Sequence, residues 1–475
     1  MGFWAAPKLT LTLCVLVFSS VAVSQDSSAS GDVRSLLREA SALIPRIDKV
    51  QQPSVASNLA GQQMRIGDLD GALSSVRGVE SQQGQVFAMG KIASMLAWQG
   101  NVPLALELIR NSAEGSDKDK ATGYMFVAQQ LAGRHSFEDA TRVASLIEEG
   151  PAFFGRTNLF TNAVIRIRAK QWEAGDREGA EHTLGLALGA VERERDNPFD
   201  PEFAESMPAS MYADIAGELV REGDRERALA VVERIYGLVL QSSRERPSVL
   251  LALVNAQAHL GEFQAATAAA SQMAPGQQRD GAMMFIATQR TSQGDPAEAI
   301  DEAVGLSLEG FRNGSLRGIA DALAASGDYS RALFTIDLIQ TPGERAYALA
   351  ELALEQAEKD DPAAAQILEL ASEAALRAGG ETKPYVFEFI AVTRGTLGDF
   401  ARAEEMINVM DDQSKVWPLW NLTEMLVHSG KETEAVSLAE NQTAPHPKAY
   451  ALLGTATALI EKRREASRKA ADSTK

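Results

Sequence analysis

Eleven near-copies of one short pattern recur along most of the sequence, and this repetition constrains the fold more than any other feature. In each copy an apolar helical pattern stops at a glycine or polar residue, and an alanine follows five positions later. These alanines lie 32 to 48 residues apart and are Ala72, Ala105, Ala140, Ala180, Ala228, Ala266, Ala299, Ala332, Ala365, Ala403 and Ala435. A unit of this length cannot bury its own apolar face, so neighbouring copies must stack. The sequence therefore predicts one long array.

The stretch Leu316 to Ile339 is the regular copy and shows the chemistry of each position. Gly327 ends the first helix, because glycine adopts the left-handed conformation that other residues resist. Asp328 is expected to cap the second helix by accepting hydrogen bonds from its free N–H groups. The segment Asp295 to Glu298 predicts the same cap in another copy, with proline at the first helical position. Each copy therefore predicts a helix-turn-helix hairpin.

A second column of small residues lies twelve positions before those alanines. Its members are Ala60, Ala93, Ala128, Ala216, Ala287, Ala320, Ala353 and Ala391. Val254 and Thr423 are mild departures from this column, and Arg168 is a strong one. Small side chains allow two helices to approach closely, so both columns are expected where the two helices of a hairpin cross.

This order of residues resembles the tetratricopeptide repeat, which has a small residue, a turn, an aromatic residue and an alanine in succession. The matching residues are Ala320, Gly327, Tyr329 and Ala332 in one copy and Ala391, Gly398, Phe400 and Ala403 in another. The usual tryptophan and the later proline of that family are missing, and the Thr-Pro-Leu-His turn of the ankyrin repeat is also absent. The resemblance implies an all-α fold, an open right-handed α-solenoid of about eleven stacked hairpins over residues 53–440.

The two ends of the chain differ from the repeats. Residues 1–24 combine a basic flank at Lys8, an apolar run and a small-x-small site ending at Ser24, which is typical of a secretory signal peptide. Cys14, the one cysteine, lies in this segment, so no disulfide is expected after cleavage. Residues 25–52 predict a leader and a first helix, and residues 441–475 a capping helix with a basic tail. The expected location is extracytoplasmic, either periplasmic or secreted, without membrane insertion after cleavage.

Charge and motif content bear on possible partners and chemistry. The net charge of −18 repels phosphate backbones and disfavours nucleic acid as a partner. The five histidines form no zinc-binding motif, and no Gly-x-Ser-x-Gly segment is present. Gly84 to Lys91 has the wrong glycine spacing for a phosphate loop. We therefore predict a protein that is not an enzyme and uses no metal and no cofactor.

The resemblance also implies that the first helix of each hairpin lines an inner groove. The candidate partner-binding residues on these helices are Arg65, Trp98, Arg221, His259, Arg317, Trp420 and His428. Tryptophans such as Trp98 and Trp420 either contact a partner or pack between hairpins. The acidic segment from Val191 to Pro208 is either a solvated insertion or a binding loop.

Three functions are compatible with these features. The first is an exported scaffold that binds a protein or peptide in the groove of a tetratricopeptide-like superhelix. The second is an α/α-type carbohydrate-active enzyme, which needs polar residues that converge at one mouth and usually a closed ring. The third is a structural spacer between envelope components. The sequence favours the first, because the tyrosines are scattered among many short hairpins.

Overall fold

The computed structural model describes residues 30–111, 116–149, 155–196, 198, 200, 203–242, 246–378 and 384–472. The predicted signal peptide lies outside these residues, and so does part of the predicted acidic loop. Within the described ranges every regular element is a helix, which confirms the all-α prediction.

Two kinds of helix alternate along the chain. The first helices of the hairpins, which we call A helices, are α2 (Gln52–Arg65), α4 (Gln82–Trp98), α6 (Asp117–Gly133), α8 (Arg156–Glu173), α10 (Ser206–Arg221), α12 (Arg246–His259), α14 (Gln277–Ser292), α16 (Glu309–Ala325), α18 (Pro342–Glu358), α20 (Pro384–Thr396) and α22 (Val416–His428). The second helices, which we call B helices, are α3 (Leu69–Arg77), α5 (Val102–Asn111), α7 (Phe137–Glu149), α9 (Arg177–Asp196), α11 (Arg225–Gln241), α13 (Phe263–Ala270), α15 (Pro296–Val304), α17 (Tyr329–Asp337), α19 (Ala363–Ala378), α21 (Phe400–Asn408) and α23 (Glu432–Glu440). They are flanked by α1 (Ser30–Leu43), a short 3-10 helix η1 (Ile44–Arg46) and α24 (Pro445–Asp472).

Each of the eleven predicted turns joins an A helix to the next B helix. Nine of the turns have a glycine with φ between 76° and 95°, in the left-handed region. The two irregular copies place His135 (φ 61°) and Asp360 (φ 56°) in the same conformation. In the regular copy, Gly327 N donates to Ala324 O and Asp328 N donates to Leu323 O, each at 2.9 Å. These bonds satisfy the carbonyls at the end of the A helix and confirm the predicted turn.

The predicted N-caps hold at some turns and fail at others. Asp328 Oδ1 accepts from Arg331 N at 3.2 Å, as expected. Asp295 makes no such cap, so that prediction is wrong. Its carboxylate lies 3.2 Å from Nη1 of Arg290, a largely buried guanidinium that also lies 3.0 Å from Glu302. A charged donor binds a carboxylate more strongly than a backbone N–H does, and it draws Asp295 away from the helix end.

The alanine columns are buried where the two helices of each hairpin cross. Ala332 is 0% exposed and Ala320 is 2% exposed. One predicted member is wrong, because Ala365 is exposed and Ala364 is buried in its place. The first turn of α19 is tighter, since Ala364 N donates to the carbonyl of Asp361, three residues back. In the regular copy Ala332 N donates four residues back, to Asp328 O.

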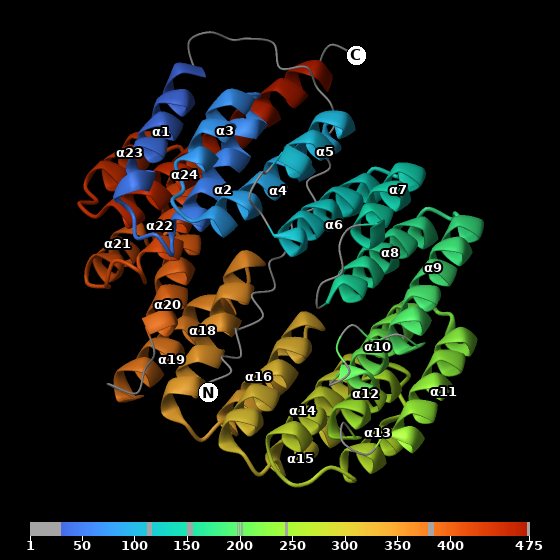
Figure 1. The fold of residues 1–475 in the computed structure, drawn as a ribbon. Helices are drawn as coiled ribbons and strands as arrows, with labels where there is room; N and C mark the ends of the chain where they lie inside the picture. Colours follow the sequence, from blue (N-terminus) through green and yellow to red (C-terminus); the bar gives the residue numbers. More distant parts are fainter. Residues whose placement is uncertain are drawn as a thin grey trace.

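The stack of hairpins closes on itself, and the prediction of an open solenoid is therefore wrong (Figure 1). Successive A helices pack side by side from α2 to α22, and α24 continues the series. Helix α24 then packs against both α1 and α2, at the opposite end of the sequence. Each B helix contacts the A helix of its own hairpin and the A helix of the next hairpin. Helix α1 contacts α24 and α2 in the same way, so it takes the place of a B helix after α24. The helix expected to cap a free end thus forms a twelfth hairpin with the first helix of the chain.

The closing seam between α24, α1 and α2 combines apolar packing with polar contacts. One hydrophobic cluster includes Leu37 of α1 together with Leu452 of α24. Tyr450 OH lies 2.8 Å from Ser54 Oγ, across from α24 to α2. Arg464 Nη2 donates to the backbone carbonyl of Arg65 at 2.8 Å. Closure therefore covers the apolar faces that an open array exposes at its two ends.

The A helices and α24 form the inner layer of the ring, and the B helices form the outer layer (Figure 1). Each A helix packs on the A helices before and after it, whereas the B helices pack mainly on A helices. Contact within the inner layer is sparsest at three junctions, between α8 and α10, between α16 and α18, and between α24 and α2. These junctions divide the ring into three groups of four hairpins.

An arginine–glutamate ion pair bridges each of the three sparse junctions. The pairs are Arg168–Glu222, Arg317–Glu351 (3.6 Å) and Arg65–Glu461 (3.2 Å). Arg168 occupies the small-residue column, where its side chain is 2% exposed and reaches the end of α10. The long side chain that replaces alanine at this position thus reaches from α8 to the next inner helix.

Candidate functional site

Aromatic side chains gather on the inner helices α18, α20, α22 and α24. We call this set the aromatic arc, and its members are Tyr347, Tyr385, Phe389, Trp417, Trp420 and Tyr450. The register of the repeat brings them together, because Tyr347, Tyr385 and Trp417 each stand thirteen residues before the left-handed turn residue of their hairpin. Equal register on successive parallel helices places these side chains beside one another.

Ring contacts link the members of the aromatic arc from helix to helix. The ring centroids of Tyr347 and Tyr385 are 4.6 Å apart, and those of Phe389 and Trp417 are 5.0 Å apart. Those of Trp420 and Tyr450 are 5.9 Å apart. The interplanar angles of 54° to 69° are in the tilted to edge-on range that aromatic pairs favour. Tyr347 is buried, and the other rings remain partly exposed. The arc is therefore an aromatic surface that a partner can contact.

Carboxyl groups lie on the same helices as these rings and on the neighbouring helix α16. Burial raises the pKa of Glu388 on α20 and of Glu424 on α22 to about 7 each. Burial also raises the pKa of Asp321, on the neighbouring helix α16, to about 7, and the charge of Glu351 adds to this effect. These carboxyls are therefore partly protonated near neutral pH, and they gain or lose protons when a charge approaches.

Arg317 is the basic group at the α16 end of the arc. Its guanidinium lies 4.7 Å from the ring centroid of Tyr347 and 3.6 Å from Glu351. The cation is thus held between an aromatic face and a carboxylate, both of which attract it. Arg317 is one of the predicted site residues, and the structure places it against Tyr347, at the end of the arc.

Three more predicted residues lie at the other end of the arc, near the closing seam. Trp420 is a member of the arc and donates a hydrogen bond to Glu424. Glu461 of α24 lies 3.2 Å from Arg65 and 3.8 Å from His428. The structure therefore brings Arg317, Trp420, His428 and Arg65 onto one continuous part of the inner layer, spanning α16 to α2.

The remaining predicted residues lie elsewhere on the ring. His259 packs edge-on against Phe285 at 5.2 Å, and burial lowers its pKa, with a further effect from Arg221. The side chain of Arg221 is 69% exposed and pairs with Glu218 on the same helix. Trp98 lies at the end of α4, where Arg134, the residue after α6, donates to its backbone carbonyl. These three residues belong to α4, α10 and α12 and do not reach the arc.

Sequence reasoning missed the arc residues Tyr347, Tyr385, Phe389 and Tyr450 and the carboxylate Glu351. The column that carries the tyrosines was visible in the sequence, since Tyr347 and Tyr385 precede their turns by the same number of residues as Trp417. The family pattern instead directed attention to positions nearer the turn. A count of aromatic residues at each repeat position, made without that pattern, identifies the column.

The raised pKa of Asp321 predicts a dependence of stability on pH. A carboxyl whose pKa rises from 3.8 to about 7 on folding stabilises the folded state below about pH 4, and this contribution is lost as the pH rises towards 7. The slope for one such group approaches about 1.4 kcal/mol per pH unit. Asp321→Asn should therefore flatten the decline in the free energy of unfolding between pH 5 and 7, measured by urea titration. Asp337→Asn, an exposed change on α17, is the control, and equal slopes in the two variants would contradict the assignment.

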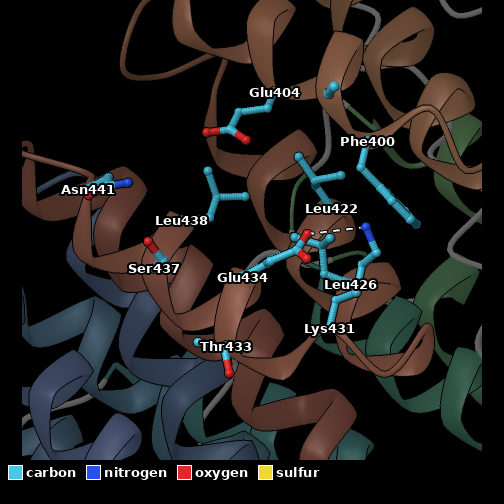
Figure 2. Close-up of a pocket in the computed structure, with 11 residues that line it drawn as sticks. Phe400, Glu404, Leu422, Leu426, Lys431, Thr433, Glu434, Ser437, Leu438 and Asn441 are labelled. Atoms are coloured by element: carbon cyan, nitrogen blue, oxygen red, sulfur yellow. Dashed lines mark hydrogen bonds and ion pairs between the residues drawn. The ribbon is translucent and has the colours of Figure 1, made fainter.

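A groove of about 460 Å³ lies away from the arc, beside the B helices α21 and α23 (Figure 2). Phe400, Leu422 and Leu438 contribute apolar surface, and the Lys431–Glu434 ion pair (3.2 Å) crosses one side. None of the raised-pKa carboxyls lines it. This groove is therefore separate from the candidate site.

Two further features bear on possible chemistry. No helix in the described ranges combines the length and apolar character needed to cross a membrane. Among the same residues, no three histidine, cysteine, aspartate or glutamate side chains come together as a metal site requires.

Comparison with known proteins finds only solved structures of low similarity. No family model and no curated protein matches the sequence. Similar solved structures include yeast Tom70 (12% identity, 88% of this chain and 97% of that one, TM-score 0.31) and Ton1535 from Thermococcus onnurineus NA1 (14% identity, 83% and 97%, TM-score 0.27). The Cut9 and Hcn1 hetero-tetramer of the APC/C is another (12% identity, 86% and 89%, TM-score 0.26). TM-scores this low carry no argument about shape or activity. The chain is a tetratricopeptide-like helical repeat protein on the strength of its own hairpins.

Proposed function

We propose that the protein is an exported, non-catalytic binding protein whose aromatic arc holds a segment of a partner protein. The observation that carries this proposal is the arc itself, in which partly exposed rings on the three successive inner helices α20, α22 and α24 form one surface beside the buried ring of Tyr347. Aromatic side chains dominate the energetics of protein interfaces because they bury large areas at little entropic cost. The helical hairpins supply a rigid support for such a surface.

The position of the arc also supports a polypeptide as the partner. The rings follow one another around the inner layer rather than converging on a single deep cavity. An extended segment can contact several inner helices in succession, as expected for a repeat array. Export is supported by the features of residues 1–24.

The alternative, an α/α-type carbohydrate-active enzyme, is favoured by two observations. The ring is closed, and carboxyls with pKa values of about 7 stand beside aromatic rings that can stack on sugars. A polysaccharide screen separates the two functions, because turnover that Glu388→Gln abolishes would support the enzyme and contradict a non-catalytic role.

The test of the proposed function compares two tryptophans of the inner layer. Protein recovered from the extracytoplasmic fraction should begin at Gln25 if residues 1–24 are removed. A partner captured with it should bind the purified protein directly, and Trp420→Ala should weaken this binding by about tenfold or more. Trp98→Ala removes the same side chain at α4, outside the arc, and should leave affinity unchanged. Equal effects of the two substitutions, with both variants folded by circular dichroism, would contradict binding at the arc.

A further inference from the structure

Glu388 is a carboxylate of the aromatic arc without a basic partner. It lies between Tyr385 and Phe389 on the same helix, and no lysine or arginine of the described ranges forms an ion pair with it. Among the residues that the structure describes, its hydrogen-bonding neighbour is Ser414, just before α22. The hydroxyl of Ser414 also donates to Asp411 Oδ2 at 2.9 Å, and one hydroxyl hydrogen serves one acceptor at a time. Glu388 is thus half-buried beside aromatic rings with its acceptor capacity largely unused.

The neighbouring helix pair shows what such a set of residues binds. Between α16 and α18, the guanidinium of Arg317 lies 4.7 Å from the centroid of Tyr347 and 3.6 Å from Glu351. Between α20 and α22, Tyr385 and Trp417 supply aromatic rings, and Glu388 stands ten residues before its turn, the position that Arg317 has on α16. This junction therefore has a carboxylate in the place of the cation. An aromatic face beside a carboxylate attracts ammonium and guanidinium groups through both the ring quadrupole and the charge. A cation at this junction would come from a partner.

The charge of the whole chain favours a cationic partner as well. The sequence carries 64 acidic and 46 basic residues, for a net charge of −18. A negative field of this kind raises the association rate of positively charged segments and opposes acidic ones. Glu388, Glu424 and Asp321 add three carboxyls on or beside the arc.

We propose that the aromatic arc selects a basic polypeptide segment, and that Glu388 with Tyr385 and Trp417 receives one of its arginine or lysine side chains. This inference rests on the proposed function and specifies the chemistry of the partner. The bound cation would pair with the carboxylate of Glu388, as Arg317 pairs with Glu351 in the protein itself. The other rings of the arc would contact the apolar parts of the same segment.

Binding of a cation at Glu388 should be linked to protons. Burial and the charge of Asp411 keep the pKa of Glu388 at about 7, so the carboxyl must lose its proton to bind a cation at neutral pH. Several ionisable groups on the elements packed against α20 already have partners. Tyr347 faces Tyr385, while Glu369 and Asp399 lie 3.6 and 3.5 Å from Arg394, and Lys415 pairs with Asp412. Affinity for the segment should therefore rise from pH 6 to pH 8.

The experiment measures fluorescence anisotropy with a labelled arginine-rich peptide and with the same peptide carrying citrulline at each arginine. Citrulline keeps the shape of the side chain and removes its charge. The full chain should bind the arginine peptide about tenfold more tightly at about 0.15 M salt. Glu388→Gln should remove most of this preference and the rise in affinity with pH. Glu405→Gln, which removes the same charge from an exposed site on α21, should leave both unchanged.

Three results would overturn this inference. The two peptides could bind with equal affinity, and Trp417→Ala could weaken the binding of both. This result would show that the arc does not select for charge, and it would leave the proposed function intact. Equal losses in Glu388→Gln and Glu405→Gln would show diffuse attraction to an acidic surface. Failure of the arginine peptide to bind would exclude a basic segment. Failure of the proposed function would be seen in a different experiment, if Trp420→Ala did not change the affinity for a captured partner.

Discussion

Deletion of residues 30–47 is expected to open the ring and to lower the free energy of unfolding more than any single core substitution. The deleted segment contains α1 and η1, in which Leu37, Leu43 and Ile44 are at most 6% exposed. Full burial of one such side chain is worth about 1.5–3 kcal/mol, so the loss should be on the order of 5 kcal/mol or more. Urea unfolding measures the loss, and small-angle X-ray scattering should report a larger radius of gyration. An open array would lose only a terminal helix.

Rescue with a separate peptide makes this prediction sharper. Because α1 completes the hairpin of α24 without a connecting loop, a synthetic peptide of residues 30–47 should bind the shortened protein and restore its stability. The same peptide with Leu37→Ala is the matched control and should bind more weakly, because a buried Leu→Ala change costs about 2–5 kcal/mol. An unchanged radius of gyration and melting temperature after deletion would show that the ring does not depend on its seam.

Arg168→Ala is expected to lower the free energy of unfolding by about 3–5 kcal/mol. The side chains of Arg168 and Glu222 are only 2% and 4% exposed, and they pair across the sparse junction between α8 and α10. Removing one partner of a buried ion pair leaves the other charge without compensation, which accounts for the size of the effect. Urea unfolding at pH 7 measures the change, and Arg166→Ala on the exposed face of α8 should cost less than about 1 kcal/mol.

Replacing both charges distinguishes the ion pair from simple packing. Nε and Nη2 of Arg168 have no hydrogen-bond partner among the described residues, so the pair is only partly satisfied. Apolar groups of similar volume often replace such pairs without loss, and Arg168→Met combined with Glu222→Leu should recover most of the stability lost in Arg168→Met alone. A double variant as unstable as the sum of the single changes would assign the effect to packing volume instead.

Local chemistry explains which parts of the fold were predictable. The turns follow from residues adjacent in sequence, and even His135 and Asp360 adopt the conformation that the repeat requires of glycine. The prediction that Asp295 caps α15 failed because Arg290, on the preceding helix, binds the carboxylate of Asp295. The prediction that Ala365 is buried failed because the first turn of α19 is one residue tighter than in the regular copy.

Long-range contacts explain what the sequence did not predict. Closure depends on α24 and α1, which lie at opposite ends of the chain and share no turn that marks them as a hairpin. The arc was predicted in part, because Trp420 and Arg317 follow from the repeat register. The sequence showed that Arg168 interrupts the column of small residues. It did not show that Arg168 pairs with Glu222, because this contact depends on how α8 and α10 pack.

Ring closure also sets the order in which the protein completes its fold. During synthesis α1 emerges well before its main partner α24, which is the last of the described helices. The apolar face of α1, which includes Leu36 and Leu37, therefore lacks its main cover until α24 has been made. The last native contact thus has the greatest separation in sequence, and contacts of that kind form slowly. The same closure fixes the number of hairpins, because a hairpin gained or lost would change the circumference that α1 and α24 must complete.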